Sequence, residues 1–193
     1  MIQLALIRHG HTHWNREGRI QGRTDIPLDA EAEQHLSGLR LPAAFGSYDL
    51  VSSPLLRAAR TAELIAGRAA TPVSNLTEMD WGDWEGKKGV DLLATPGSGY
   101  RHIEDWGWDF RPPNGESPAE VRDRLEPWVA GLTQDTVAVC HIGIMRVLMA
   151  KASGWAFSGA APFRIKRDRL FCLNIDAQNW RVDGEPVRLE TRK

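Results

Sequence analysis

Residues 1–15 read MIQLALIRHGHTHWN, and this stretch decides the fold. Residues 2–7 are almost entirely apolar, too short a run for a helix and rich in residues that favour strands. Apolarity without alternation is typical of a strand buried on both faces, as in the middle of a parallel sheet. The run ends at Arg8, His9 and Gly10. Because ligands of open α/β sheets bind beyond the carboxyl ends of the strands, we predict that Arg8 and His9 lie at the mouth of a pocket.

The composition is that of a soluble globular domain with a substantial core, since 42% of the 193 residues are hydrophobic and 25% are charged. The formal net charge is −1, so no overall field favours nucleic acid or an anionic membrane as a partner. Cys140 and Cys172 lie in apolar runs and are expected to be buried thiols in a reducing compartment. No leader precedes the first strand and no apolar run reaches the length of a membrane span, so we expect a cytoplasmic protein.

Strand and helix signals alternate along the rest of the chain. Strands are predicted at residues 48–52, 72–75, 136–140 and 170–175, and Asp183-Gly184 predicts a hairpin turn near the C-terminus. Helices are predicted over 30–36 after an Asp29 cap, over 55–68 with Ser53 as N-cap, over 118–132 after a Ser117–Glu120 capping box, and over 144–152. This order predicts an α/β protein, a three-layer α/β/α sandwich with a mainly parallel central sheet.

Between residues 76 and 115 the hydrophobic periodicity fails, in segments such as GDWEGKK and DWGWDFRPPNGE. We interpret this region as a lid-like excursion inserted into one domain that spans residues 1–193. The excursion contains the side chains Tyr100, His102, Trp106 and Trp108. These rings either stack on a base or sugar of a ligand or form a small local core, and the sequence leaves both interpretations open.

Basic side chains follow three of the predicted strands. The first strand ends at Arg8 and His9. The helix after the second strand carries Arg57 in its first turn, and the strand over 136–140 is followed by His141. Because the carboxyl ends of parallel strands share one edge of a sheet, we expect the two arginines and two histidines to converge there. Guanidinium groups match phosphate oxygens, so the cluster is interpreted as a phosphate site, with a neutral His9 as a nucleophile for phosphorus.

His9, His11 and His13 also form an H-x-H-x-H pattern, which on an extended segment would place three imidazoles on one face, as in a metal site. Against this interpretation, the neighbouring Arg8 would repel a cation and no Asp follows the pattern closely. We therefore expect no metal ion. A lone histidine is more often a satisfied buried side chain, but the position of His9 beside Arg8, with His141 at an equivalent strand end, favours a role in binding or catalysis.

Six blocks of sequence carry a family resemblance. The first is RHG at residues 8–10 with Thr12, Trp14 and Asn15 behind it. The others are GRIQGRTDIPL (18–28), SSPLLRAARTAE (52–63), LTEMDWGDWEG (76–86), PPNGES (112–117) and His141-x-Gly-x-x-Arg146. Together they resemble the histidine phosphatase superfamily, in the branch of phosphoglycerate mutases and cofactor-independent phosphatases. EMDWGDWEG followed by PPNGES is similar to the cofactor-independent phosphatases, including α-ribazole phosphatase-like proteins.

The resemblance implies roles for individual residues. His9 matches the nucleophile that becomes phosphohistidine, and Glu78 matches the general acid that protonates the leaving alkoxide and then activates water. The positions that hold the phosphoryl oxygens are matched by Arg8, Arg57 and His141. Asn15 matches a phosphate-contacting position, and Gln21 and Gly22 match a substrate-facing one. From the residues alone, Glu78 is not distinguished from the nearby acids, which are expected to be solvated: Asp80, Asp83 and Glu85.

The expected activity is that of a metal-independent phosphomonoesterase with no cofactor, acting on a small phosphate monoester. The alternatives are a phosphotransferase like phosphoglycerate mutase and a regulatory protein that binds a phosphate ligand without turnover. The complete set of matched residues argues against the second alternative. The sequence allows a homo-oligomer but does not specify the oligomeric state or the physiological substrate.

Overall fold

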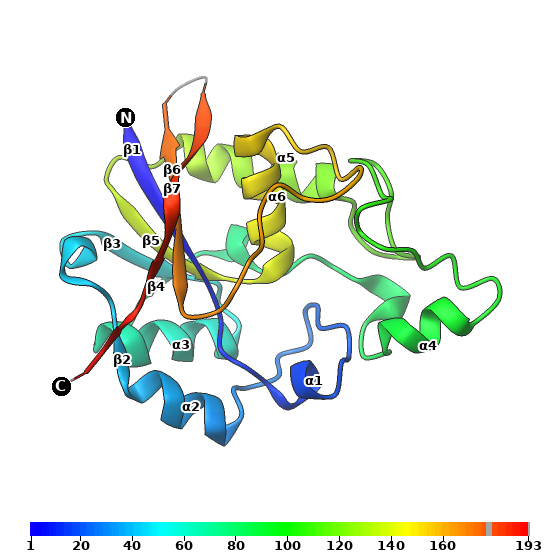
Figure 1. The fold of residues 1–193 in the computed structure, drawn as a ribbon, viewed down its shortest axis with the longest axis horizontal. Coiled ribbons are helices and arrows are strands. Elements are labelled where there is room, and N and C mark those ends of the chain that lie inside the picture. The colour runs from blue at the N-terminus through cyan, green and yellow to red at the C-terminus, as the bar shows by residue number, and fades with distance from the viewer. Residues whose placement is uncertain (177–178, 193) are drawn as a thin grey trace.

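The computed structural model describes residues 1–176 and 179–192, and Figure 1 shows its fold. A six-stranded sheet has the order β4-β3-β5-β1-β6-β7. Its strands are β1 (Ile2–Arg8), β3 (Asp49–Ser52), β4 (Thr71–Pro72), β5 (Thr136–Cys140), β6 (Arg169–Ile175) and β7 (Trp180–Arg188). A two-stranded sheet pairs β2 (Leu39–Arg40) with β8 (Glu190–Thr191). The helices are α1 (His13–Arg16), α2 (Ala30–Ser37), α3 (Leu56–Ala66), α4 (Gly89–Ala94), α5 (Pro118–Ala130) and α6 (Ile142–Ser153). Within the described ranges, none of the helices has the length and apolarity that crossing a bilayer requires.

Strand β1 lies at the centre of the sheet. It pairs in parallel with β5, and the parallel part continues through β3 to β4. On its other side β1 pairs antiparallel with β6, which pairs antiparallel with β7. Leu4, Ala5, Leu6 and Ile7 are at most 1% exposed, so the first strand is buried on both faces as predicted. The mainly parallel sheet confirms the predicted fold class.

The two faces of β1 contribute to two hydrophobic clusters. Leu4 and Leu6 pack with residues of α5 and α6, whereas Ala5 and Ile7 pack with residues of α2 and α3. This division follows from the alternation of side chains along a strand. In Figure 1, α5 and α6 lie toward the upper right and α2 and α3 toward the bottom, on opposite sides of the strands, which is the expected three-layer arrangement. The buried, unpaired Cys140 and Cys172 belong to opposite clusters.

Two of the predicted helix caps are confirmed. The Asp29 carboxylate accepts a hydrogen bond from the backbone N–H of Ala32 at 2.7 Å, at the start of α2. Ser117 and Glu120 form the reciprocal capping box at the start of α5, with a proline in its first turn. Both signals are local in the sequence, and both set a helix start directly.

The Ser53 cap is wrong. Helix α3 begins at Leu56, and its N-cap residue is Leu55, whose side chain makes no capping hydrogen bond. The Ser53 hydroxyl accepts from the backbone N–H of Leu55 at 3.3 Å, in the turn before the helix, and it also lies 2.7 Å from Nε2 of His141. The side chain that the local pattern assigned to the helix start therefore has a second, tertiary partner, and the helix begins later.

The strand predicted at residues 72–75 is shorter than expected. Strand β4 covers only Thr71–Pro72, and a 3₁₀ turn follows at Ser74–Leu76. Since proline has no N–H to donate to a ladder, Pro72 is tolerated at this edge of the sheet but does not extend the pairing.

The hairpin predicted at Asp183-Gly184 is also wrong. Strand β7 runs from Trp180 to Arg188 with a bulge at this position, and the chain has already reversed, because Ile175 pairs with Trp180. Gly184 has a φ of +63°, and both a bulge and a tight hairpin use this left-handed backbone. The Asp-Gly pair therefore marks a backbone irregularity without specifying which one.

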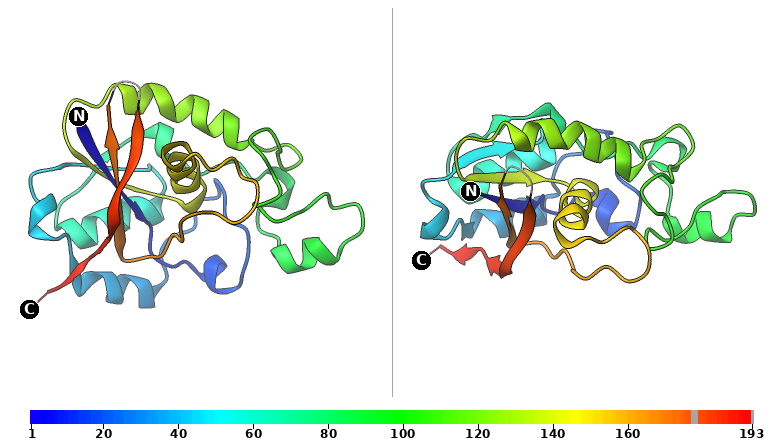
Figure 2. Two further views of the ribbon diagram at one scale, coloured as in Figure 1. Left: turned by 45° about the horizontal axis from the view of Figure 1, so that its top comes forward. Right: turned by 90° about the horizontal axis from the view of Figure 1, so that it is seen from above.

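The excursion at residues 76–115 packs partly into the main core. Trp84 and Trp106 are 2% and 5% exposed and belong to the same cluster as α5 and α6. The ring of Trp106 lies 5.5 Å from that of Trp81 and 5.1 Å from that of Phe110. Both views in Figure 2 show α4 projecting from the body on the side away from the C-terminus. The local-core interpretation therefore holds for Trp106.

The capping box of α5 gives a stability prediction. Ser117→Ala should lower the free energy of unfolding by about 1 kcal/mol, because the backbone N–H of Glu120 loses its acceptor. Urea denaturation followed by circular dichroism measures the change. Ser117→Thr keeps the hydroxyl and should recover most of the loss. A Thr variant as unstable as the Ala variant would show that the hydrogen bond is not the source of the stabilisation.

Candidate active site

The carboxyl ends of β1 and β5 bring two histidines together. The strands pair with Arg8 opposite Cys140, and the backbone N–H of His9 donates to the Cys140 carbonyl at 3.0 Å. The next residue of each strand is a histidine, and the rings of His9 and His141 lie with their centroids 5.1 Å apart. Arg57, in the first turn of α3, donates from Nε to Nδ1 of His141 at 3.3 Å. The structure therefore brings together the basic side chains of three strand ends.

His9 is held in one tautomer. Its Nδ1 lies 2.6 Å from the Gly10 carbonyl oxygen, which only accepts, so Nδ1 carries the proton and Nε2 keeps a lone pair. The side chain is 3% exposed. Burial lowers the pKa of His9 well below its ordinary value, and the neighbouring His141, Arg57 and Arg8 act in the same direction. A neutral imidazole with a free Nε2 is a competent nucleophile.

His141 is held in the opposite tautomer. Its Nδ1 accepts from the Arg57 guanidinium, so its proton lies on Nε2, which donates to the Ser53 hydroxyl at 2.7 Å. Burial lowers the pKa of His141, and Arg57 and Arg8 lower it further. Both ring nitrogens are thus tied to protein groups, and the orientation of the ring beside His9 is fixed.

Arg57 connects this pair to the loop before α2. Its terminal nitrogens donate to the carbonyls of Gly22 and Thr24 at 2.6 and 3.0 Å. The same loop is held from outside by Glu85, whose carboxylate accepts from the backbone N–H groups of Arg23 and Thr24 at 3.2 and 2.6 Å. Gly22 therefore contributes a carbonyl that orients Arg57.

Arg8 has unused hydrogen-bonding capacity. Its Nε is buried and makes no hydrogen bond to any of the residues that the structure describes. Burial lowers the pKa of Arg8 to about 9, and the cations Arg167 and Arg146 act in the same direction. A buried guanidinium without a partner is costly unless an anion binds it. Arg8 is therefore a donor available to a phosphoryl group.

Glu78 lies close to the histidine pair, in the segment after the 3₁₀ turn at Ser74–Leu76, and it is 1% exposed. Its carboxyl oxygens accept from the backbone N–H of Met79 at 2.8 Å and from that of Gly143, two residues beyond His141, at 3.2 Å. A Cβ at residue 143 would overlap this carboxyl group, so only glycine permits the approach. Burial raises the pKa of Glu78, which these hydrogen bonds and Arg57 partly oppose. A raised pKa suits a carboxyl group that donates a proton near neutral pH.

The acids near Glu78 have different surroundings: Asp83 is exposed, and Asp80 and Glu85 are half-buried, each bonded to groups of the surrounding loops. Asp80 accepts from the backbone N–H of Gly82 at 2.8 Å, and Asp83 accepts from the Asn114 side chain at 3.1 Å. Glu85 holds the loop of residues 23–24, as described above. Among these four acids, Glu78 is the one that is buried beside His141, so the structure separates it without reference to the family.

Asn15 and Gln21 lie together beside the start of α1. Gln21 Oε1 accepts from Asn15 Nδ2 at 3.1 Å and from the Thr12 hydroxyl at 3.3 Å. Gln21 Nε2 is buried and lacks a hydrogen-bond partner within the described ranges. Asn15 and Gln21, both predicted to contact the ligand, thus belong to one hydrogen-bond network. Its unused donor, among the residues that the structure describes, is Nε2 of Gln21.

Sequence reasoning missed Arg167. This half-buried side chain precedes β6, donates from Nε to the His9 carbonyl at 3.0 Å, and donates from a terminal nitrogen to Asn15 Oδ1 at 2.9 Å. Burial lowers its pKa to about 10. Arg167 lies outside every motif block and 158 residues from His9, so no local signal marks it.

A cavity of about 420 Å³ opens onto Arg8 and Asn15. Among the residues that line it are the cations Arg19 and Arg167, the imidazoles His11 and His102, Tyr100, and the apolar Val90 and Leu93. No carboxylate among the described residues lines it. The two interpretations of the rings in the excursion therefore apply to different side chains. Tyr100 and His102 line this cavity, where a ligand could stack, whereas Trp106 packs in the core.

The H-x-H-x-H pattern does not form one face. Strand β1 ends at Arg8, and His13 is an exposed residue at the start of α1, whereas His9 is buried. In the part of the chain that the structure describes, no three His, Cys, Asp or Glu side chains come together as a potential ligand set. The extended segment that the metal interpretation required is thus not formed.

The two tautomers give a pH prediction. Because the pKa values of His9 and His141 are lowered, both rings should stay neutral as the pH falls through 6.5, with the proton on Nδ1 of His9 and on Nε2 of His141. Long-range ¹H–¹⁵N correlation spectra of histidine-labelled protein report both properties, and single His→Gln variants assign them. The unfolded chain takes up these protons below about pH 6.5, so the folded state should lose stability as the pH falls further. An imidazolium pattern for either ring near pH 6 would contradict the assignment.

The chain is similar to proteins of known family over nearly its whole length. The family model of the histidine phosphatase superfamily (branch 1) matches residues 4–185. A protein named probable phosphoglycerate mutase GpmB, from Salmonella paratyphi C (strain RKS4594), is 40% identical over 194 residues, covering 95% of this chain and 90% of the relative.

Two solved structures are similar to this chain over nearly its whole length. The phosphoglycerate mutase structure from Thermus thermophilus superimposes with a TM-score of 0.73 at 34% identity, covering 99% of this chain and 100% of that one. A mycobacterial glucosyl-3-phosphoglycerate phosphatase, solved in complex with VO3, superimposes with a TM-score of 0.81 over 97% of this chain and all of its own, and at 23% identity this likeness concerns the fold alone. With the family model matched from residue 4 to residue 185, the chain belongs to the histidine phosphatase superfamily, branch 1.

Proposed function

We propose that this chain is a metal-independent phosphatase that hydrolyses a small phosphate monoester through a phosphohistidine on His9, with Glu78 as general acid and base. The observation that carries the proposal is the state of His9, a buried neutral imidazole whose Nε2 is free among cationic donors. Arg8, Arg57 and His141 would bind the phosphoryl oxygens, with the Nε2–H of His141 donating to the ligand in place of the Ser53 hydroxyl, and Asn15 and Gln21 would contact the substrate. Family membership supports chemistry on a phosphate ester.

The first step transfers the phosphoryl group to the enzyme. Nε2 of His9 attacks phosphorus in line with the leaving oxygen, so that the N–P bond forms as the P–O bond breaks. The protonated carboxyl group of Glu78 gives its proton to the leaving alkoxide. The guanidinium groups of Arg8 and Arg57 stabilise the charge on the equatorial oxygens.

The second step regenerates the enzyme. The Glu78 carboxylate, ionised by the first step, takes a proton from water as the water oxygen attacks phosphorus. The N–P bond breaks, its electron pair returns to Nε2 of His9, and inorganic phosphate leaves. One carboxyl group therefore serves as acid and then as base, and the cycle needs no external proton donor.

A phosphoglycerate mutase activity is the second candidate. The names of the Salmonella and Thermus relatives favour it. In that case a phosphoglycerate, and not water, would accept the phosphoryl group from His9. The similarity of EMDWGDWEG and PPNGES to cofactor-independent phosphatases favours hydrolysis. That the protein is cytoplasmic stays a prediction, and a homo-oligomer stays a possibility that the sequence allows.

A turnover screen separates the two candidates. Nucleotides, sugar phosphates, phosphoglycerates and α-ribazole phosphate are incubated with the protein in EDTA and followed by ³¹P NMR. We expect release of inorganic phosphate from at least one ester. Isomerisation of 3-phosphoglycerate without phosphate release would favour the mutase, and activity that EDTA removes and zinc restores would contradict the metal-independent mechanism.

His9→Ala should abolish turnover and phosphoenzyme formation while leaving the fold intact, since the side chain supplies the attacking nitrogen. Rapid quench with a ³²P-labelled ester should give an acid-labile, base-stable protein label on the wild type and none on the variant. Circular dichroism checks the fold. A label that persists on the variant would place the nucleophile elsewhere.

Glu78→Gln should slow phosphorylation of His9 by an alkyl phosphate by about 10²-fold or more, because an alkoxide leaves poorly without a proton. The same step with p-nitrophenyl phosphate should lose much less, since p-nitrophenolate leaves without help. Single-turnover measurements isolate this step from dephosphorylation. Asp83→Asn is the matched control, because Asp83 is exposed and its carboxylate accepts from the side chain of Asn114 in a loop. Equal slowing of both substrates by Glu78→Gln would refute the acid assignment.

A further inference from the structure

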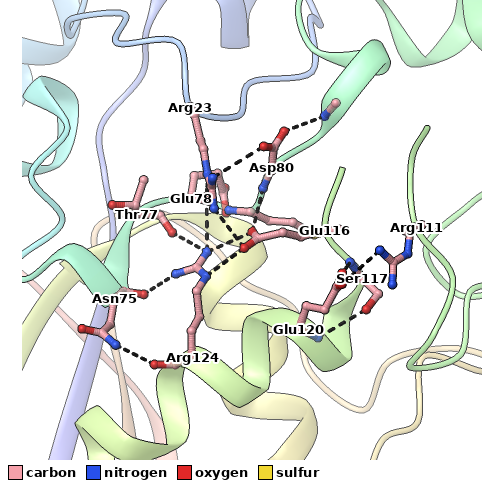
Figure 3. Close-up of polar contacts among 12 residues, drawn as sticks. Arg23, Asn75, Thr77, Glu78, Asp80, Arg111, Glu116, Ser117, Glu120 and Arg124 are labelled. Carbon is pink, nitrogen blue, oxygen red and sulfur yellow. Dashed lines mark hydrogen bonds and ion pairs between the residues drawn. The ribbon is translucent and has the colours of Figure 1, made fainter. Parts of the chain in front are cut away.

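A group of charges that the proposed mechanism does not use lies next to Glu78 (Figure 3). Its centre is Glu116, in the segment before α5. One carboxylate oxygen of Glu116 lies 2.9 Å from Arg23 and 3.2 Å from Nε of Arg124, and the other lies 3.2 Å from a terminal nitrogen of Arg124. The side chains of Glu116 and Arg124 are 18% and 21% exposed, so this ion pair is largely withdrawn from solvent.

Both arginines also bind the carbonyl of Glu78, and Arg124 binds the backbone before it as well. Arg124 donates to the carbonyls of Asn75, Thr77 and Glu78, the last two at 2.8 and 3.3 Å. Arg23 donates from Nε to the same Glu78 carbonyl at 3.4 Å. The backbone at Glu78 is therefore held by two guanidinium groups, one from the loop before α2 and one from α5, and Figure 3 shows both converging on it.

The backbone on the C-terminal side of Glu78 is held by Glu116 itself. Its carboxylate accepts from the backbone N–H of Asp80 at 2.9 Å, and its own N–H donates to the Asp80 carbonyl, also at 2.9 Å. Residues 77–80 are thus fixed on both sides of Glu78 by one carboxylate and its two cationic partners. The Glu78 side chain has no part in this group, because its oxygens accept from Met79 and Gly143.

We propose that Glu116 is a positioning residue for the reaction: through Arg23 and Arg124 it fixes the backbone at Glu78 and so places the Glu78 carboxyl group for proton transfer. Without the Glu116 charge, Arg124 loses the carboxylate that aligns it on the Glu78 carbonyl, and Arg23 loses the nearer of its two carboxylates and keeps Asp80 at 3.5 Å. Proton transfer needs the donor within hydrogen-bond reach of the leaving oxygen, and a displacement of about 1 Å can cost about 10²-fold in rate.

The proposal rests on the proposed role of Glu78, so its test uses the same leaving-group comparison. Glu116→Gln keeps the shape of the side chain and removes its charge. We expect it to slow phosphorylation of His9 by an alkyl phosphate by about tenfold, and by p-nitrophenyl phosphate by less than about threefold. The double variant with Glu78→Gln should be no slower than Glu78→Gln alone, because positioning acts only through that carboxyl group.

Glu120→Gln is the matched control. Glu120 lies in the first turn of α5, just after Glu116, is paired at the surface with Arg111 at 3.0 Å, and as Gln still completes the capping box. It should show no leaving-group dependence. If Glu116→Gln does not fold, Arg23→Gln replaces it. Arg23 is 44% exposed and loses the same carbonyl contact, so a smaller effect of the same kind is expected.

The outcomes separate the two proposals. Suppose that Glu78→Gln shows the leaving-group dependence. The positioning role is then wrong, and the acid assignment stands, if Glu116→Gln slows both substrates equally. The same holds if Glu116→Gln multiplies the effect of Glu78→Gln in the double variant. If Glu78→Gln itself lacks the dependence, the proposed acid is wrong and the role of Glu116 falls with it.

Discussion

The parallel pairing of β1 with β5 is the contact on which the candidate site depends. Because the strands run in the same direction with Arg8 opposite Cys140, the residues that follow them emerge at one level, and both are histidines. The register is fixed by burial, since Leu4 and Leu6 face one hydrophobic cluster and Ala5 and Ile7 face the other. A shift of one residue would exchange the two faces and separate His9 from His141. The apolar packing that fixes the register of the sheet therefore also fixes the distance between the two histidines.

Features with a local and sufficient signal could be predicted from the sequence. The apolar run of β1 and the Ser117–Glu120 box each determine an element through neighbours a few residues away. Local signals failed where a distant group used the same side chain or where one backbone shape serves two purposes. Ser53 has the chemistry of an N-cap but bonds to His141, and Asp183-Gly184 has the chemistry of a hairpin but forms a bulge.

The rest of the site depends on partners that are remote in the sequence. The roles of Arg167 and Arg124 become visible only in the folded chain. The backbone carbonyls that Arg167 and Arg124 bind belong to residues 158 and 46–49 positions away, respectively. An arginine on a helix or in a loop gives no periodic signal for such a contact. The distinction between Glu78 and its acidic neighbours is of the same kind, because it rests on burial beside Gly143 rather than on residue type.

The concentration of arginines has two consequences that support one another. Arg8, Arg57, Arg146 and Arg167 all have lowered pKa values, for which burial is the largest cause. Such cations are costly to bury, and a phosphoryl dianion bound among them offsets that cost, so ligand binding and folding stability are coupled. Arg57, Arg8 and Arg167 also oppose protonation of His9, because an imidazolium would add a further cation to the cluster. The groups available to bind a phosphoryl group therefore also keep its proposed acceptor, Nε2 of His9, free of a proton, and removing one of these three arginines would raise the pKa of His9 as well as weaken anion binding.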